Sequence, residues 1–183
     1  MSQPIPTRHP LRRYFIALTE HAFINTIGVG DPKLTDYLAD LLVRFVHVDA
    51  IWKLRSVRGK PLHEVAEMMA EADAENRTAG SAREFHRHVG DFTLFWTGTY
   101  PEALRQLRAP LCKDHLIDYP QQGKRSYWIA SQYDDEPFRD EAPVLRRLSE
   151  EFELCAYGLG QVRREWQKVE PDLEAELRQR III

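Results

Sequence analysis

Cysteine is scarce in this chain. Only two are present among 183 residues, Cys112 and Cys155, and neither belongs to a Cys-x-x-Cys pair. Two such residues cannot build a disulfide framework, and no zinc-knuckle pattern accompanies them. We therefore expect both to be buried free thiols in a protein that lives in a reducing compartment.

Long hydrophobic runs and clusters of one charge sign are also missing. The most apolar runs reach only about a dozen residues and are broken by charge, too short to span a bilayer. The start of the chain, MSQPIPTRHPLRRY, lacks the apolar segment of a secretory signal. Net charge is -3 and acids and bases are mixed. We expect a cytoplasmic protein that binds neither membrane nor nucleic acid.

Strand patterns and nucleotide, metalloprotease or hydrolase motifs are absent as well. No stretch alternates cleanly over five residues, and no Asn-Gly or Asp-Gly turn occurs. The hydrophobic fraction of 43% and charged fraction of 29% are ordinary for a globular domain. We predict an all-α, single-domain bundle of about seven or eight helices over residues 11–183, preceded by a flexible arm at 1–10.

Two long amphipathic helices dominate the predicted bundle, at about 32–55 and 142–168. Their apolar residues alternate in steps of four and three, which places them on one stripe of a helix. Asp31 followed by Pro32 supplies an N-cap for the first helix. Gly158 and Gly160 could break the second, and the sequence leaves that open. The stripes are Leu34, Leu38, Leu41, Phe45, Val48 and Trp52, and Leu148, Phe152, Cys155, Leu159, Val162 and Trp166.

Shorter helices are expected where caps and apolar spacing agree. One begins near Leu11 and another at Pro61. Capping boxes at 81–84 and 99–102 start two more, with Gly98 ending the first of them. Asp118 begins the next, and a charged helix is expected at 171–180.

The stretch 86–102, HRHVGDFTLFWTGTYPE, carries the most suggestive chemistry. On a helix it is apolar nearly all round, which predicts burial. His88 and Asp91 then lie on the same side, three residues apart. One interpretation is a carboxylate that orients an imidazole for metal binding or general-base catalysis. The other is a buried polar group that is simply hydrogen-bonded to its neighbours.

Two further residues are candidates for the same site. Asp49 falls at the edge of the first long stripe, where a carboxylate is unusual. His21 lies on the shoulder of the N-terminal helix. A mononuclear metal site of His21, Asp49, His88 and Asp91 requires three helices to converge. A di-iron centre is excluded because the chain has no Glu-x-x-His motif.

Two functions remain after these exclusions. We favour a non-enzymatic structural or interaction domain, able to form oligomers through apolar helix faces or through the tail Ile181, Ile182 and Ile183. The alternative is a helical enzyme or binder of a small ligand or metal, built around His88 and Asp91 with Asp49 and His21. No cofactor is indicated by any motif.

Overall fold

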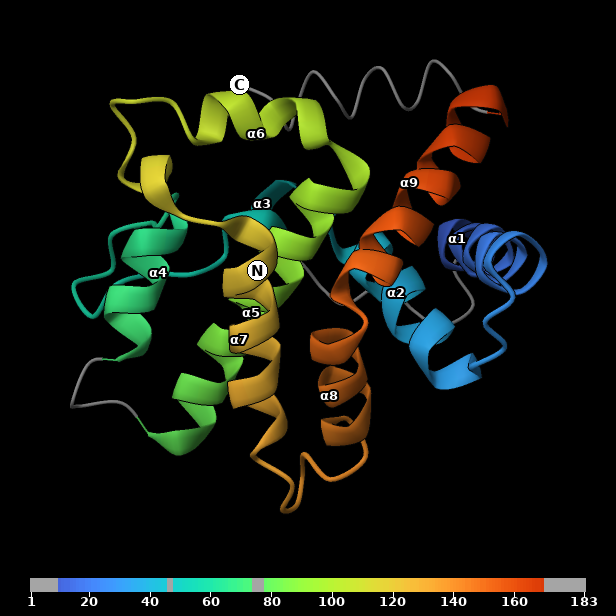
Figure 1. Cartoon of the computed structure of the whole chain (residues 1–183). Coiled ribbons are helices and arrows are strands. Elements are labelled where there is room, and N and C mark those ends of the chain that lie inside the picture. The colour runs from blue at the N-terminus through green and yellow to red at the C-terminus, as the bar shows by residue number, and fades with distance from the viewer. Residues whose placement is uncertain (1–9, 46–47, 74–77, 170–183) are drawn as a thin grey trace.

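The computed structural model describes residues 10–45, 48–73 and 78–169, excepting the side chains of Pro10, Val48 and Asp49. Within these ranges the fold is all-α, as predicted, and contains no strand, only one isolated bridge between Arg55 and Pro61 (Figure 1). No helix in the same ranges is long and apolar enough to cross a bilayer. The predicted arm, the helix at 171–180 and the isoleucine tail lie outside the described residues, apart from Pro10, which begins α1.

The elements follow in chain order. They are α1 (Pro10–Glu20), the π-helix η1 (His21–Ile27), α2 (Pro32–Phe45), α3 (Val48–Ile51), α4 (Val65–Ala72), α5 (Ala79–Thr99), the 3-10 helix η2 (Pro101–Ala103), α6 (Leu104–Leu107), the 3-10 helix η3 (Lys113–Leu116), α7 (Tyr119–Ser131), α8 (Ala142–Glu150) and α9 (Phe152–Val169).

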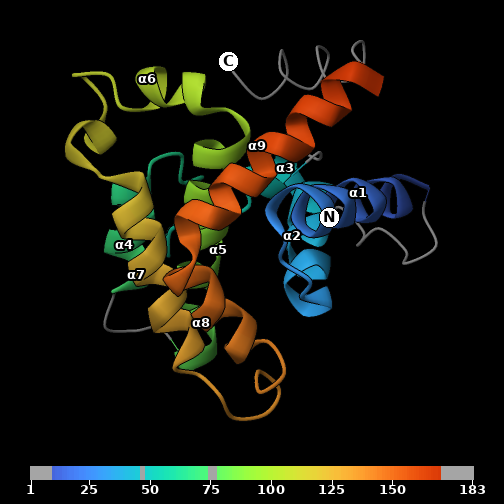
Figure 2. The same ribbon diagram turned by 45° about the vertical axis from the view of Figure 1, so that its right-hand side comes forward.

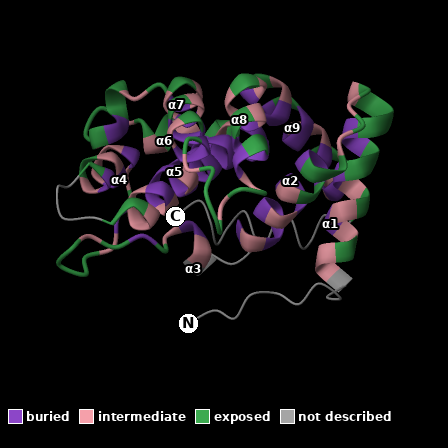
Figure 3. Ribbon diagram, turned by 90° about the horizontal axis from the view of Figure 1, so that it is seen from below, coloured by how far each residue is buried: buried purple, intermediate pink, exposed green. Residues whose placement is uncertain are grey.

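Helix α5 is the centre of the bundle. It packs against α7, α9 and α4, and more narrowly against α2. In two views, α4 lies on one side of it and α1 and α2 lie on the other (Figure 1 and Figure 2). Its middle, from His88 to Trp96, is buried at every position, and burial is concentrated along it (Figure 3). The prediction that this stretch is a buried helix is confirmed.

The first long helix was predicted to reach Arg55, and this is wrong. Helical structure ends at Ile51, the last residue of α3, with 46–47 outside the described residues. The chain then turns back, and the Leu62 N–H donates to the Leu54 carbonyl at 3.1 Å. Trp52 and Leu54 still pack against the core although they follow the helix, so apolar residues continue after helical structure has ended. Spacing alone therefore overestimated the helix length.

The second long helix, predicted at 142–168, is two helices. The break lies at Glu151, between α8 and α9, whereas Gly158 and Gly160 lie inside α9. The Glu151 carboxylate accepts a hydrogen bond from Arg147 Nε at 3.1 Å across the break. Leu148 and Phe152 are both fully buried on either side. One irregular residue thus changes the helix axis without interrupting the apolar stripe.

Of the predicted N-caps, those at Asp31 and Asp118 are correct and the one at Ser81 is wrong. Asp31 Oδ1 accepts from the Lys33 N–H at 2.9 Å, and Asp118 Oδ1 accepts from the Gln121 N–H at 3.0 Å, so both are N-caps. The box at Ser81 is wrong, because the helix begins earlier and its cap is Thr78, which accepts from the Ser81 N–H.

The predicted end of this helix at Gly98 is also wrong. Gly98 is helical, and α5 continues to Thr99, followed by η2. A side chain at Gly98 would collide with the Ala156 carbonyl and the Leu159 side chain of α9. This glycine therefore serves close helix packing rather than termination.

Gly158 has a similar role at the contact between α9 and η1. A methyl group there would overlap the Phe23 ring, which is fully buried. We predict that Gly158→Ala lowers the free energy of unfolding by about 1–3 kcal/mol, the usual range for overpacking. Gly30→Ala is the matched control, because nothing lies within 4 Å of its added methyl. Urea unfolding of both variants measures the difference, and equal stability would contradict the packing described.

Candidate functional site

The candidate site is a buried carboxylate held between three helices. We call it the Asp91 centre: Asp91 of α5, Tyr37 and Arg44 of α2, and Tyr127 of α7. Tyr37 and Arg44 are two helical turns apart and therefore share a face of α2. Tyr127 can approach because the neighbour of Asp91 is Gly90, whose added methyl would stand only 2.7 Å from the tyrosine ring.

Each of the three partners in the Asp91 centre contacts the carboxylate. The Tyr37 hydroxyl donates to Asp91 Oδ1 at 2.7 Å, and the Tyr127 hydroxyl donates to the same oxygen at 2.9 Å. Arg44 Nη2 lies 3.1 Å from Asp91 Oδ2 in an ion pair. Asp91 is only 1% exposed. A buried charge is tolerable only when it is paired and hydrogen-bonded in this way.

The ionisation states in the Asp91 centre follow from these contacts. Burial alone would raise the pKa of Asp91, but the positive charges of Arg44 and Arg87 and the Tyr37 hydrogen bond outweigh it and lower that pKa. Burial, and then the nearby Asp91 charge, raise the pKa of both Tyr37 and Tyr127. The carboxylate is therefore ionised and both phenols are protonated donors.

His88 is buried beside the centre but has a different partner. Its Nε2 lies 3.0 Å from the Ile51 carbonyl, so Nε2 carries the proton and donates. Its Nδ1 is buried and has no hydrogen-bond partner. Burial, and then the charge of Lys53, lower the pKa of His88 to about 3. The imidazole is therefore neutral, packed against the Phe45 and Phe92 rings.

The structure brings together only part of the predicted metal set. His88 and Asp91 are buried on the same stretch of α5, yet no hydrogen bond joins them. His21 lies exposed on η1, where its Nδ1 meets Asn25 Nδ2 at 3.0 Å. Asp49 lies on α3, but its side chain is outside the described residues. Among the side chains described, no three His, Cys, Asp or Glu residues are grouped to hold a metal ion.

A second layer of charge surrounds the Asp91 centre. Arg83 and Arg87 of α5 each form ion pairs with both Glu84 and Glu141. Arg83 is 1% exposed and its guanidinium lies 4.1 Å from the centre of the Phe138 ring. This layer fastens the segment before α8 onto α5, and it gives Glu84 an ion-pair role in place of the predicted capping role.

Sequence reasoning missed Tyr37 and Arg44 as partners of Asp91. Arg44 follows Asp40 by four residues, a spacing typical of an ion pair on the surface of a helix, but the Asp40 carboxylate instead pairs with Arg12 Nε at 2.7 Å. The available signal was that Tyr37 follows Leu34 by three residues and so borders the apolar stripe of α2. A polar residue at such a border often has a buried partner.

The contacts of the Asp91 centre suit a structural role better than catalysis or metal binding. A general base or a metal ligand must reach its substrate or ion. Asp91 and His88 are each 1% exposed, and both oxygens of Asp91 already contact donors. The contacts instead tie α2 and α7 to α5, which favours the interpretation of Asp91 as a satisfied buried polar group.

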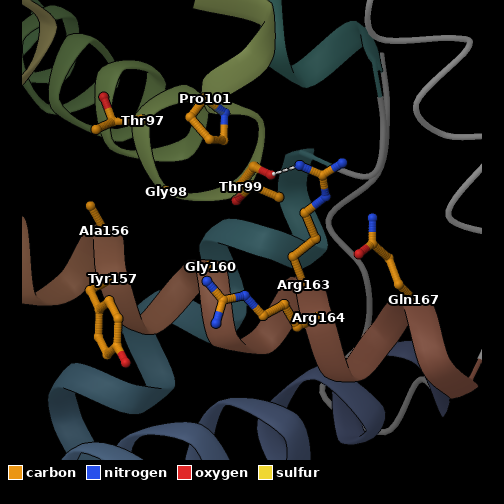
Figure 4. Close-up of a pocket in the computed structure, with 10 residues that line it drawn as sticks. All are labelled: Thr97, Gly98, Thr99, Pro101, Ala156, Tyr157, Gly160, Arg163, Arg164 and Gln167. Atoms are coloured by element: carbon orange, nitrogen blue, oxygen red, sulfur yellow. Dashed lines mark hydrogen bonds between the residues drawn. The ribbon is translucent and has the colours of Figure 1, made fainter.

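A groove elsewhere on the protein is a second candidate site. It has a volume of about 420 Å³ and lies between the end of α5 and α9 (Figure 4). Arg163, its most enclosed cation, already donates to the Thr99 carbonyl at 2.6 Å and to Glu102. The Thr97 and Thr99 hydroxyls are buried and out of reach of a solute. The groove therefore offers a ligand few donors. It is lined by Thr97, Gly98, Thr99, Pro101, Ala156, Tyr157, Gly160, Arg163, Arg164 and Gln167.

The structural role of Asp91 predicts a stability effect. Asp91→Asn keeps an acceptor for the tyrosines but leaves the Arg44 charge without its partner. We expect a loss of about 2–4 kcal/mol in unfolding free energy, below the full cost of an orphaned buried charge because Arg44 reaches solvent. Asp40→Asn, at an ion pair whose carboxylate is 45% exposed, is the control and should cost less than about 1 kcal/mol. Equal losses in chemical denaturation would refute the assignment.

His88 predicts how stability depends on pH. Its pKa is about 3 in the folded chain and 6.5 ordinarily, so between these values the unfolded chain binds the proton and the folded chain does not. The neutral His88 side chain therefore contributes fully to the unfolding free energy above about pH 6.5. This contribution is lost as the pH falls below that value, at up to about 1.4 kcal/mol per pH unit. His88→Gln should flatten the pH profile of the unfolding free energy, and exposed His63→Gln should not. Parallel profiles for wild type and His88→Gln would contradict the burial of a neutral imidazole.

Comparisons with protein-family models, with curated proteins and with solved structures give no match for this chain.

Proposed function

We propose that this protein is a non-enzymatic interaction domain, and that it binds a partner protein through residues 104–117, here called the leucine segment. The observation that carries this proposal is the exposure of two large apolar side chains. Leu111 is 101% exposed and Leu116 is 87% exposed. The apolar stripes of the long helices, by contrast, are used inside the bundle. Apolar side chains held in water on one segment are typical of a binding surface.

The leucine segment is held in place by a buried anchor. Asp114 is 1% exposed and lies between the two leucines in sequence. Its carboxylate accepts from the Val65 N–H at 2.9 Å, from the Ala66 N–H at 2.8 Å and from the Tyr119 hydroxyl at 2.7 Å. It therefore caps the N-terminus of α4 from outside that helix. A surface held this firmly loses little conformational entropy on binding.

Contacts within the leucine segment, and one from it to Glu64, add to this rigidity. The His115 ring meets the Arg108 carbonyl at 3.1 Å, and the Cys112 N–H donates to the Ala109 carbonyl at 2.8 Å. The Lys113 N–H donates to Glu64 at 2.6 Å. The segment is thus a folded surface rather than a loose loop.

The charge of the leucine segment indicates the kind of partner. Arg105 and Arg108 are exposed in the segment, and the segment's one acid, Asp114, is buried and engaged. A partner must therefore present apolar side chains among acidic ones, because complementary charge steers association. An acidic amphipathic segment of another protein fits this description.

The enzymatic alternative has less support. It depended on His88 and Asp91 with Asp49 and His21, and the two described as buried are engaged by their own chain. Self-association through the isoleucine tail concerns residues outside those described and stays a prediction.

A peptide selection tests the proposed function. Random peptides are displayed against the full chain and counter-selected against Leu111→Ser/Leu116→Ser. We expect enriched peptides that combine acidic and apolar residues, bind at least about tenfold more weakly to the double variant and weaken in salt. Val57→Ser, at another exposed apolar residue, is the matched control. The double variant should keep its unfolding free energy within about 0.5 kcal/mol.

Three results would contradict the proposed binding surface. If no peptide is enriched, if enriched peptides bind the double variant as tightly as wild type, or if they are basic, the leucine segment is not the proposed binding surface.

A further inference from the structure

We infer that residues 170–183, here called the terminal segment, dock on the leucine segment of the same chain and compete there with the partner protein. This inference rests on the proposed function, because it names what occupies that surface when no partner is bound. The terminal segment lies outside the described residues, but its sequence and the place where α9 ends are known.

The terminal segment has the chemistry that the leucine segment requires of a partner. It reads EPDLEAELRQRIII, with four acids ahead of its two arginines. Leu173, Leu177 and Ile181 are spaced four apart, so on a helix they share one side. The chain therefore carries an acidic amphipathic segment of its own.

The two segments are complementary in charge and in apolar surface. The acids of the terminal segment all fall within residues 170–176, whereas the exposed charges of the leucine segment include Arg105 and Arg108. Leu111 and Leu116 offer exposed apolar side chains to the three isoleucines that end the terminal segment. Contact between the two removes both apolar groups from water, and opposite charges favour it.

The end of α9 brings the terminal segment towards this surface. Arg163 of α9 donates to the Thr99 carbonyl at 2.6 Å and to Glu102 at 2.7 Å, and Glu102 precedes the leucine segment by two residues. Helix α9 ends at Val169, about 9 Å further along its axis. Its last turn and α6, which belongs to the leucine segment, lie at the same end of the molecule in two views (Figure 1 and Figure 2).

The terminal segment is also long enough to reach the exposed leucines. It can span at most about 50 Å when fully extended, and a domain of this size has a radius of gyration of only about 16 Å. A ligand tethered to its own binding site has an effective concentration in the millimolar range. Even a weak contact would therefore keep the leucine segment occupied until a partner displaces it.

The two thiols of the chain provide a direct probe of this contact. Cys112 is half-buried and is the neighbour of Leu111, so a docked terminal segment would shield it from a thiol reagent. Cys155 is fully buried, and burial raises the pKa of its thiol to about 12. A reagent such as DTNB therefore reacts with Cys112 in the folded protein.

The rate at which DTNB modifies Cys112 in the full chain tests the inference. We expect Ile181→Ser/Ile182→Ser/Ile183→Ser to react at least about threefold faster than wild type, the ratio for a segment that is docked two thirds of the time. Ile24→Ser, at an exposed isoleucine of η1, is the matched control and should react as wild type does.

A synthetic peptide of residues 170–183 gives a second readout. Added to the triple serine variant, it should restore the slow reaction of Cys112, which local unfolding in that variant could not explain. It should have no effect when Leu111→Ser and Leu116→Ser are also present, because its docking surface is then lost.

Three results would overturn the inference. They are equal Cys112 rates in wild type and the triple serine variant, a peptide that restores no protection, and protection that grows with protein concentration. The last result would assign the docked segment to a second copy of the chain. None of them touches the proposed function, which fails if selected peptides ignore the leucine segment. Protection of Cys112 together with a failed peptide selection would keep the internal contact and remove the partner.

Discussion

The buried charge of Asp91 is the constraint on which the rest of this structure depends. An ionised carboxylate inside a helical bundle is stable only if donors and a cation reach it from neighbouring helices. Here Tyr37 and Arg44 come from α2 and Tyr127 from α7, and all three contact Asp91. The positions of α2 and α7 against α5 follow from that requirement. So does the absence of a side chain at Gly90, which admits the Tyr127 ring.

The sequence predicts those parts of the fold that depend only on the spacing of residues within one helix. The buried middle of α5 and the caps at Asp31 and Asp118 are of this kind, because apolar periodicity and hydrogen-bonding side chains act within one helix. The break at Glu151 is not, because the apolar stripe keeps its phase from Leu148 to Phe152 although the axis changes. Periodicity records which side is buried and says little about where a helix bends.

The same distinction between local and long-range features applies to the candidate site. His88 and Asp91 could be placed on one side of α5 from their spacing, whereas Arg44 could not be assigned to Asp91, since that contact joins residues far apart in the chain. The leucine segment was missed for another reason. Leu111 and Leu116 look like ordinary core residues in sequence, and nothing in their local spacing indicates that they face solvent, as they do in the structure.

The Asp91 centre thus holds the helices together in the interior, apart from the exposed leucine segment. A double-mutant cycle of Arg44→Met and Asp91→Asn tests this claim most directly. If the pair acts as a unit, the double variant will be more stable than the sum of the single losses predicts, by at least about 1 kcal/mol in urea unfolding. Losses that add within about 0.5 kcal/mol would show that the two residues are independent and would contradict the central role of Asp91.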